Sequence, residues 1–384
     1  MLNSNLKQSA GYSASRGFGG WRWRALKWGF ASLSAAALLG AVAVEAIAVG
    51  SNLQGQESSR FLSTNGSDLH RAGFFADQGL RAFSQGDLVG ATQHWQNALL
   101  LYKAGGDRAG EGRMLENLSV LHRLDDEVEE AVALSEQAIA LYEALGIAET
   151  QPSAYLNLGS AYRLAQRTGE AIVAYERGLD FYQRKADVQG ERILLSLLAQ
   201  IHKDNLDYAR AIAYQQQALA LSRKIGNSAA EAEALSELGY AYVMDERPAE
   251  AALSLQQALA IYRELDDMAQ AVAVLNNLGK AAALSEDYAL ALRSYREALT
   301  IFQALDYAEQ AAHVLVNMGQ VQVAMGDEVG AIASYQEAIA LSEMLRKRTG
   351  ESLSPRVEAA YRKLAALLQQ QNQAAEAQQV LGLI

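Results

Sequence analysis

Residues 153–184 read SAYLNLGSAYRLAQRTGEAIVAYERGLDFYQR, and this stretch decides the fold. Its first half places apolar and small residues on one helical stripe: Leu156, Leu158, Gly159 and Tyr162. After a break at residues 167–169, its second half forms another stripe: Ala171, Tyr175 and Gly178. Two helices with facing apolar stripes, and small residues where they cross, predict a helical hairpin.

The hairpin recurs every 40 residues along the chain. The small residue at 178 aligns with Ala98, Ala138, Ala218, Ala258, Ala298 and Ala338. The start of the second helix aligns at Ala91, Ala131, Ala171, Ala211, Ala251, Ala291 and Ala331. A fixed period in this range indicates stacked repeats that bury one continuous core. The sequence therefore predicts an all-α solenoid.

Helix-start signals agree with this frame. The chain has three prolines, Pro152, Pro248 and Pro355, and each lies where a helix is expected to begin. Proline is tolerated there because its missing N–H would have no partner in the first turn. Carboxylates that can cap free N–H groups precede four of the second helices: Asp87, Asp207, Asp287 and Asp327.

Composition excludes several classes of function. The chain has no cysteine, so it has no disulfide, catalytic thiolate or zinc–thiolate site. Its net charge is −11, although residues 1–27 contain five basic residues and no acidic one. The acidic balance therefore belongs to the rest of the chain, which argues against duplex nucleic acid as a partner, because phosphate contacts need a basic face.

Residues 28–50 form a largely apolar segment next to the basic n-region 1–27, and two interpretations remain open. An uncleaved transmembrane anchor fits the length and the flanking Trp21, Trp23 and Trp28. A cleaved signal peptide would use the small residues at 41–43 or 46–48. In both cases the repeats are expected on the non-cytoplasmic side, in a periplasm or lumen, as a single-pass membrane protein or, after cleavage, as an exported soluble protein. Residues 51–70, rich in Ser, Asn, Gln and Gly, are expected to be a flexible linker.

The repeat resembles the tetratricopeptide (TPR) repeat. In the third unit the matching positions are Tyr155, Leu158, Gly159, Tyr162, Ala171, Tyr175 and Gly178. The period exceeds the family's usual one, as in kinesin-light-chain-like and LGN-like arrays, and this would lengthen both helices. The resemblance implies a right-handed solenoid of seven repeats over residues 71–345. In units two and four Ser135 and Gln215 replace the aromatic residue, and His122 and His202 replace the tyrosine, so we expect looser packing there.

The frame slips after Leu345. The next match begins 46 residues on, at Tyr361, and the stretch 346–352 is expected to form an extra loop. The last helix is short and rich in glutamine. A polar terminal unit stops further stacking, so residues 346–384 are expected to form an insertion and a truncated eighth repeat that acts as a C-terminal cap.

The sequence contains no constellation typical of catalysis. The five histidines are scattered, with no pair at the spacing that holds a metal, and no glycine-rich loop leads into Lys-Ser/Thr. We therefore expect no enzyme activity, no cofactor and no metal.

Two rows on the first helices are candidates for binding. One row, four residues after the small position, reads Phe83, Arg123, Arg163, Lys203, Val243, Ala283 and Val323, and Arg113 could extend its basic part. The other precedes Leu-Gly and includes Asn117, Asn157, Asn277 and Asn317. In the family the first helices line the concave groove, where basic and asparagine side chains hold peptides. Cations there would select an acidic segment, and amides would bind a peptide backbone. The competing interpretations are a solvated charge row and amides bonded to the adjacent turn.

The sequence thus predicts a membrane-tethered or exported scaffold that binds a protein or peptide segment and supports a membrane-associated complex, with no nucleic-acid partner. The alternative is a peptide-sensing regulator whose superhelix changes shape on binding. The expected groove residues are Arg113, Asn117, Arg123, Asn157, Arg163, Lys203, Asn277 and Asn317.

Overall fold

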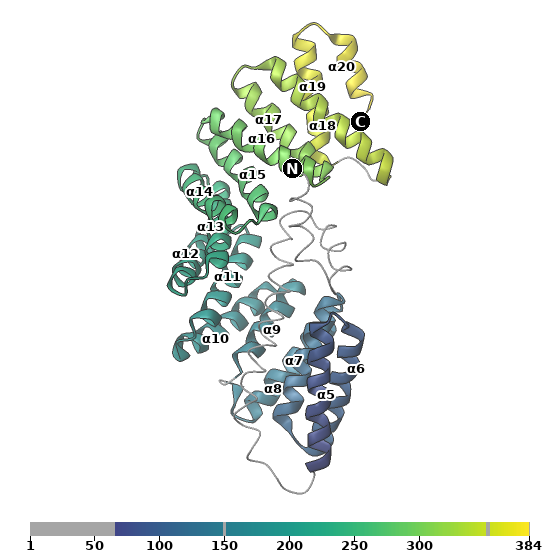
Figure 1. Cartoon of the computed structure of the whole chain (residues 1–384), viewed down its shortest axis with the longest axis vertical. Coiled ribbons are helices and arrows are strands. Elements are labelled where there is room, and N and C mark those ends of the chain that lie inside the picture. Colours follow the sequence, from purple (N-terminus) through teal and green to yellow (C-terminus); the bar gives the residue numbers. More distant parts are fainter. Residues whose placement is uncertain (1–65, 149–150, 351–353, 384) are drawn as a thin grey trace. The chain divides into compact units, whose positions relative to one another are not determined.

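The structure is a computed structural model that describes residues 66–148, 151–350 and 354–383. These residues form sixteen α-helices, α5 to α20, and contain no strand (Figure 1). None of these helices is both long and apolar enough to cross a membrane. The n-region 1–27, the apolar segment 28–50 and nearly all of the linker lie outside the described residues.

The helices alternate as first and second members of eight hairpins. The first helices are α5 (Gly66–Ser84), α7 (Arg108–Leu124), α9 (Pro152–Leu164), α11 (Val188–Asp204), α13 (Ser228–Met244), α15 (Met268–Leu284), α17 (Ala308–Ala324) and α19 (Pro355–Gln370). The second helices are α6 (Leu88–Gly105), α8 (Val128–Ala144), α10 (Thr168–Lys185), α12 (Tyr208–Lys224), α14 (Pro248–Glu264), α16 (Tyr288–Ala304), α18 (Glu328–Thr349) and α20 (Ala374–Leu381). The predicted all-α repeat architecture is confirmed.

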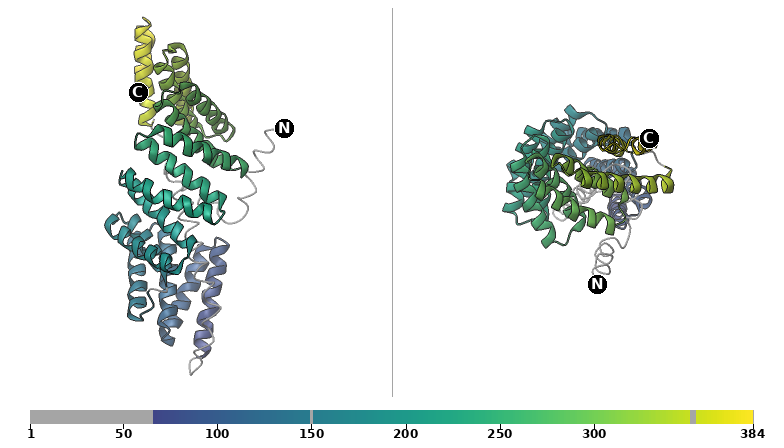
Figure 2. Two further views of the ribbon diagram at one scale, coloured as in Figure 1. Left: turned by 90° about the vertical axis from the view of Figure 1, so that its left-hand side faces the viewer. Right: turned by 90° about the horizontal axis from the view of Figure 1, so that it is seen from above.

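The chain divides into two compact units, each described by itself. Unit 1 ends at Asn205 and unit 2 begins at Leu206, so α11 and α12 belong to different units. Within each unit consecutive helices pack against one another, as the two views of Figure 2 also show. First helices also contact the next first helix: α7 contacts α9 in unit 1, and α13, α15, α17 and α19 contact in sequence in unit 2. The first helices of each unit thus form a shared surface, which we call its first-helix face.

Packing between the two helices of a hairpin depends on a small residue opposite a bulky one. A methyl group added at Gly159 would lie 2.4 Å from a ring carbon of Tyr175. The same close approach joins Gly279 to Tyr295 and Gly239 to Leu255. Because no Cβ fits at these three positions without displacing the ring or the leucine, glycine is required there.

In hairpin two, both helices carry a small polar residue at this crossing point. Ser119 and Ser135 are both fully buried, and their hydroxyl oxygens are 2.6 Å apart. Ser119 donates its hydroxyl to the carbonyl of Ala131 at 2.7 Å, so Ser135 is the donor to Ser119. Both hydroxyl groups are thus buried and hydrogen-bonded, and looser packing at this hairpin stays a prediction.

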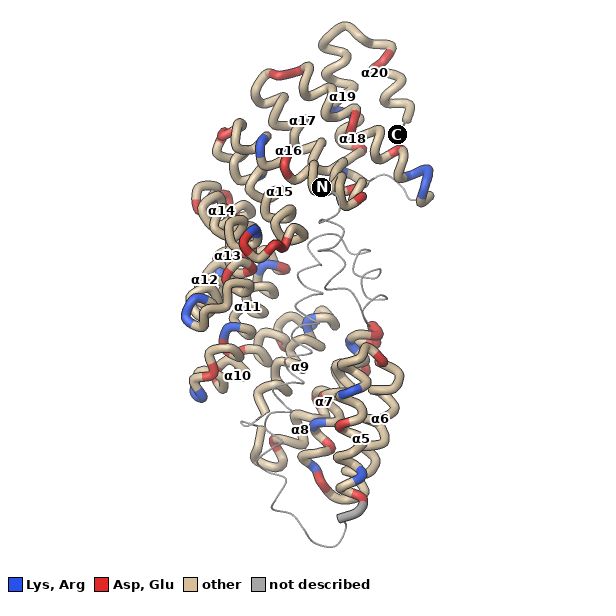
Figure 3. Tube along the Cα trace, in the orientation of Figure 1, with Lys and Arg blue, Asp and Glu red and all other residues tan. Residues whose placement is uncertain are grey.

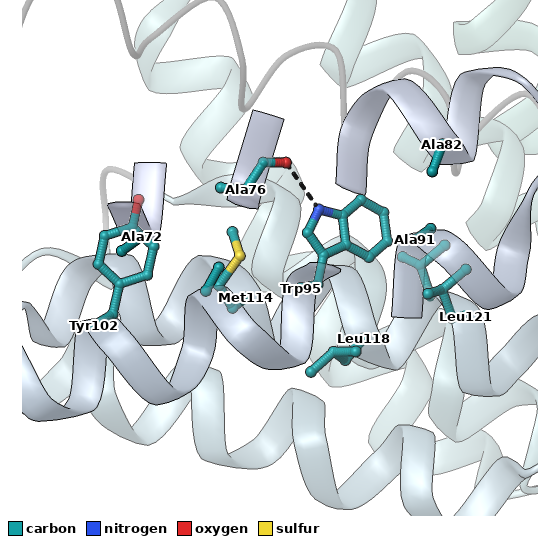
Figure 4. Packing of buried hydrophobic residues seen from close by; sticks show 11 residues of the cluster. Ala72, Ala76, Ala82, Ala91, Trp95, Tyr102, Met114, Leu118 and Leu121 are labelled. Carbon is teal, nitrogen blue, oxygen red and sulfur yellow. Dashed lines mark hydrogen bonds between the residues drawn. The ribbon is translucent and has the colours of Figure 1, made fainter. Parts of the chain in front are cut away.

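In the first hairpin, the large side chain opposite the small residue is a tryptophan. Trp95 from α6 is completely buried among Ala76, Ala91, Leu118 and other members of the core that links α5, α6 and α7 (Figure 4). Its indole N–H donates to the carbonyl of Ala76 at 3.2 Å. The ring therefore fills the space beside Gly79 without leaving its donor unsatisfied.

The turns repeat every 20 residues, half the repeat period. From Gly86 to Gly326 each turn contains one residue with positive φ, and the next residue donates its N–H to a carbonyl five positions back, as from Asp87 to Ala82 at 2.9 Å. Both turns of the repeat therefore use the same helix-ending motif. Non-glycine residues such as Gln166, Ala186 and Leu206 hold this left-handed conformation in several turns.

Side-chain caps occur at the four predicted helix starts and also at four helices where they were not predicted. Asp87, Asp207, Asp287 and Asp327 accept a backbone N–H at the start of their second helices. First helices carry equivalent caps from Asp107, Asp187, Asn227 and Asp267. The three prolines begin α9, α14 and α19.

The predicted loop at 346–352 is wrong in its first half. Residues 346–349 continue α18, which has 22 residues and ends at Gly350 with φ of 74°. The insertion therefore lengthens α18 by about one turn: position 346, where the frame would place the left-handed turn residue, is helical, and the left-handed residue is Gly350. The extension carries the basic run Arg346, Lys347 and Arg348, visible at the end of α18 in Figure 3.

Candidate functional site

Six of the eight predicted groove residues lie on the first helices of unit 1 and two on those of unit 2. In unit 1, α7 carries Arg113, Asn117 and Arg123, α9 carries Asn157 and Arg163, and α11 carries Lys203. In unit 2, Asn277 lies on α15 and Asn317 on α17. Within unit 1, Asn117 and Lys203 are half-buried.

A buried carboxylate joins three helices of unit 1. Glu116 on α7 accepts hydrogen bonds from Tyr142 Oη on α8 at 2.6 Å and from Ser153 Oγ on α9 at 3.1 Å, and Asn157 Nδ2 approaches at 3.4 Å. Burial raises the pKa of Glu116 to about 6, and these three donors, with nearby Arg113, act in the opposite direction. The carboxyl group can therefore gain or lose its proton near neutral pH.

Arg123 is a buried guanidinium with no counter-ion among the residues that the structure describes. Its side chain is 7% exposed, and Nε and Nη1 have no hydrogen-bond partner among the described residues. Burial, with a smaller contribution from the like charge of Arg163, lowers the pKa of Arg123 to about 10, while Tyr175 acts in the opposite direction. Arg123 is still charged at neutral pH. A buried charge without an opposite charge is costly, so this geometry favours an anion that comes from outside the chain.

Arg163 occupies the same repeat position but is neutralised. Its Nη1 lies 3.4 Å from a carboxylate oxygen of Asp204, which is 41 residues further along the chain on α11. The residue 41 positions after Arg123 is Leu164, so Arg123 has no such acid. Of the two arginines, only Arg123 thus retains an uncompensated charge.

Further unpaired atoms lie on the same surface. Arg113 Nε, Asn157 Oδ1 and Arg163 Nε are buried without hydrogen-bond partners among the described residues. Buried polar atoms are usually paired, so several unpaired donors and one unpaired acceptor on two helices in contact indicate a surface suited to a polar ligand. These atoms are on α7 and α9, which contact each other.

The two predicted residues of unit 2 lie in a second polar cluster. Asn277 Oδ1 accepts a hydrogen bond from Lys280 Nζ at 3.3 Å, and Asn317 Nδ2 donates to Asn276 Oδ1 at 3.3 Å. The asparagine row is therefore partly engaged by neighbouring side chains of the chain itself. Asn317 is buried, whereas Asn277 is half-buried.

Sequence reasoning missed the residues that occur only once in the frame. Glu116 aligns with Leu156, Ser196, Ser236, Asn276 and Val316, and Lys280 aligns with Val120, Ser160, Gln200, Tyr240 and Gln320. A single charged residue in an otherwise uncharged column is a signal that comparing columns could have found. The described residues contain no group of acids and histidines that could hold a metal ion.

Family comparisons place the repeats within a known group. Models of the tetratricopeptide repeat match residues 113–145, 152–184, 191–264 and 270–344, which is more than half of the chain. A search of curated proteins found no match.

Solved structures show the same fold at low sequence identity. The apo form of RapI is 16% identical, with 70% of this chain and 94% of that chain covered and a TM-score of 0.54. A STAND protein with a tetratricopeptide repeat sensor, PH0952 from Pyrococcus horikoshii, is 18% identical, with 84% of this chain and 52% of that chain covered and a TM-score of 0.55. BtubC (BKLC) from P. vanneervenii is 21% identical, with 59% and 94% covered and a TM-score of 0.49.

Proposed function

The chain belongs to the tetratricopeptide repeat family, and on this premise we propose that it is a non-catalytic binding scaffold. Its first-helix face in unit 1 binds an acidic segment of a partner protein. The observation that carries this proposal is Arg123, a buried cation with unpaired donors and no carboxylate partner in the described part of the chain. A partner carboxylate would supply the missing charge through charge-assisted hydrogen bonds.

The surrounding residues suit an extended segment. Arg113 and Asn157 place an unpaired donor and an unpaired acceptor on the same pair of helices as Arg123. One donor and one acceptor together can bind the backbone of a peptide, whatever its side chains. Binding to a surface already held by packed helices needs little reorganisation.

The N-terminal segment supports a proposal for the location of the protein in the cell. The apolar segment 28–50 tethers the repeats to a membrane, or directs their export, and places the scaffold on the non-cytoplasmic side. This is tested by fractionating cells that produce the intact chain and a form without residues 1–50. Membrane recovery of the intact chain alone supports the tether, and recovery of both forms in the cytoplasm contradicts it.

The binding surface is tested by site-specific photo-cross-linking in cells. The photoreactive amino acid benzoylphenylalanine replaces Asn117, half-buried on α7, or, as a control, Val173, which is exposed on the second helix α10. We expect a discrete cross-linked partner from position 117 that disappears with Arg123→Glu. Equal capture from position 173, or capture that survives Arg123→Glu, would contradict the proposal. Far-UV circular dichroism confirms that each variant is folded.

The alternative role as a peptide-sensing regulator differs in one measurable respect. A sensor changes shape when its peptide binds, whereas a pre-formed scaffold does not. Small-angle scattering with and without the captured segment separates the two: an unchanged radius of gyration supports the scaffold, and a clear decrease supports the sensor.

A further inference from the structure

Unit 2 contains a group of basic side chains on its own first-helix face. Lys280 is half-buried on α15, His313 is half-buried on α17, and Arg356 lies in the first turn of α19. Contacts between α15 and α17 and between α17 and α19 bring these three elements together. The group therefore depends on the stacking of three consecutive hairpins.

No carboxylate balances these charges. Lys280 Nζ donates to Asn277 Oδ1, a neutral acceptor, and neither Lys280 nor Arg356 forms an ion pair with any described acid. Burial, together with the nearby charge of Arg356, lowers the pKa of Lys280 to about 8. Burial and then the charges of Arg356 and Lys280 lower the pKa of His313 to about 4. Each basic group is thus within electrostatic range of another, and their effects have the same sign.

Neutral polar groups lie beside the cations. At neutral pH His313 is uncharged because of its low pKa, and its Nε2 lies 2.9 Å from Ser354 Oγ on the segment that leads into α19. Asn277 and Asn317 provide amide groups on α15 and α17. A pair of cations with neutral donors around it is the arrangement that binds the oxygens of an anion.

We propose that Lys280 and Arg356 form an oxyanion-binding site on the first-helix face of unit 2, with Asn277 and His313 as neutral polar partners. The oxyanion is a phosphate or a carboxylate group carried by the ligand. This site is separate from the Arg123 surface of unit 1, and each can fail without the other.

A solvated charge row is the competing explanation, and the position of Lys280 argues against it. In the other six repeats the residue aligned with Lys280 is uncharged: Leu80, Val120, Ser160, Gln200, Tyr240 and Gln320. Lys280 is also half-buried, so its charge loses part of its hydration without gaining an acid. A lysine that served only solubility would extend into water instead.

The test follows His313 directly. The protein is labelled with ¹⁵N-histidine and titrated at pH 7 with inorganic phosphate or acetate, with chloride adjusted to hold the ionic strength constant. We expect a saturable shift of the His313 resonance with one or both anions, and no such shift for His94, which lies in unit 1. Saturation with phosphate alone identifies a phosphate ligand, and saturation with acetate identifies a carboxylate.

Matched variants decide whether the proposed residues form the site. Lys280→Met keeps the length of the stem, and we expect the saturable shift to disappear. Arg356 is exposed, so Arg356→Gln should leave the fold intact. It should weaken anion binding by about tenfold, the effect of one charge-assisted hydrogen bond. Arg362→Gln is the control, because Arg362 lies on the same helix but pairs with Glu358 at 3.7 Å. The proposal is overturned if neither anion saturates the wild type, or if Arg356→Gln and Arg362→Gln behave alike.

Discussion

Hairpins two and three are neighbours in unit 1 with the same backbone frame and different chemistry. Hairpin two, α7 and α8, buries Glu116, the Ser119–Ser135 pair and the unpaired Arg123. Hairpin three, α9 and α10, places Leu156, the Gly159–Tyr175 pair and the neutralised Arg163 at the same positions. At these three positions hairpin two has polar or unpaired charged side chains, whereas hairpin three has an apolar side chain, a glycine–tyrosine pair and an arginine paired with an acid.

This difference separates what the repeat frame fixes from what it leaves free. The frame fixes which positions meet, since it sets helix length, turn geometry and the crossing point. It does not fix charge, and hairpin two retains polar groups that an apolar core would not need. Stability alone would favour the composition of hairpin three, because buried unpaired charges destabilise a fold. This contrast is the reason that we propose hairpin two as the binding part of unit 1.

We expect the largest change in stability from substitutions where the two helices of hairpin two cross. Ser135→Tyr places the ring of hairpin three opposite the side chain of Ser119, and we expect a loss of about 3–4 kcal/mol from overpacking and from the broken hydroxyl bond. Adding Ser119→Gly makes room for the ring and should recover most of this loss. Urea unfolding measures both. Equal destabilisation of the single and double variants would show that the small–bulky pairing does not govern the crossing.

The two arginines give the next largest effect. Arg123→Met should stabilise unit 1 by about 2–3 kcal/mol, because it removes a buried charge that has no partner. Arg163→Met should change stability by less than about 1 kcal/mol, because the pair that it breaks is partly exposed to solvent. Hydrogen exchange of α7 and α9 amides, which reports local opening in a repeat array, measures the difference. Destabilisation by Arg123→Met would show that the structure has a counter-ion for it.

Because of Glu116, the stability of hairpin two should depend on pH. Its pKa is raised to about 6, so the folded state binds a proton more tightly than the unfolded state, and stability falls as pH rises from about 4.5 to 6. Glu116→Gln removes this dependence, and its new N–H can donate to the unpaired Asn157 Oδ1. The variant should match the wild type below pH 4.5 and exceed it by about 2 kcal/mol above pH 6.

Urea unfolding at pH 4, 5, 6 and 7 measures this difference. Glu176→Gln, at an exposed position on α10, is the control and should follow the wild-type profile. A constant gap between wild type and Glu116→Gln at all four pH values would contradict the role of the carboxyl proton.

The turns provide the smallest effect. Gln166 in hairpin three has φ of 58° and Asp126 in hairpin two has φ of 65°. Gln166→Gly should stabilise the fold by about 0.5–1 kcal/mol, since a left-handed residue with a Cβ is strained. Asp126→Gly should gain less, because aspartate tolerates this conformation better. Thermal unfolding compares the two variants, and an equal or larger gain for Asp126→Gly would contradict the argument.

The sequence predicted the fold because repetition multiplies a weak local signal. A single alanine such as Ala171 indicates little, but seven aligned alanines locate the second helix in each of the first seven hairpins. The positions of the candidate residues on first helices were predictable for the same reason. The extension of α18 was not, since it depends on where the first residue able to end the helix occurs.

The alignment of equivalent residues in successive repeats could not predict which of the basic side chains is paired with an acid. Arg123 and Arg163 are equivalent in the sequence, and only the contact with Asp204 on the next first helix distinguishes them. The burial of Glu116 also depends on donors from α8 and α9 that converge in space. Pairing across helices decides which residue of a row retains an uncompensated charge.

We propose above all that the uncompensated charge of Arg123 binds an acidic segment. The most direct measurement is the affinity of 12-residue peptides that contain Asp or Glu at their centre, each compared with its Asn or Gln copy, for the wild type, Arg123→Met and Arg177→Met. Arg177 lies on α10 and pairs with Glu143, so it serves as the control. We predict that acidic peptides bind the wild type and the control at least about tenfold more tightly than their neutral copies, and that Arg123→Met abolishes this preference. An acidic preference that survives in Arg123→Met would contradict the claim.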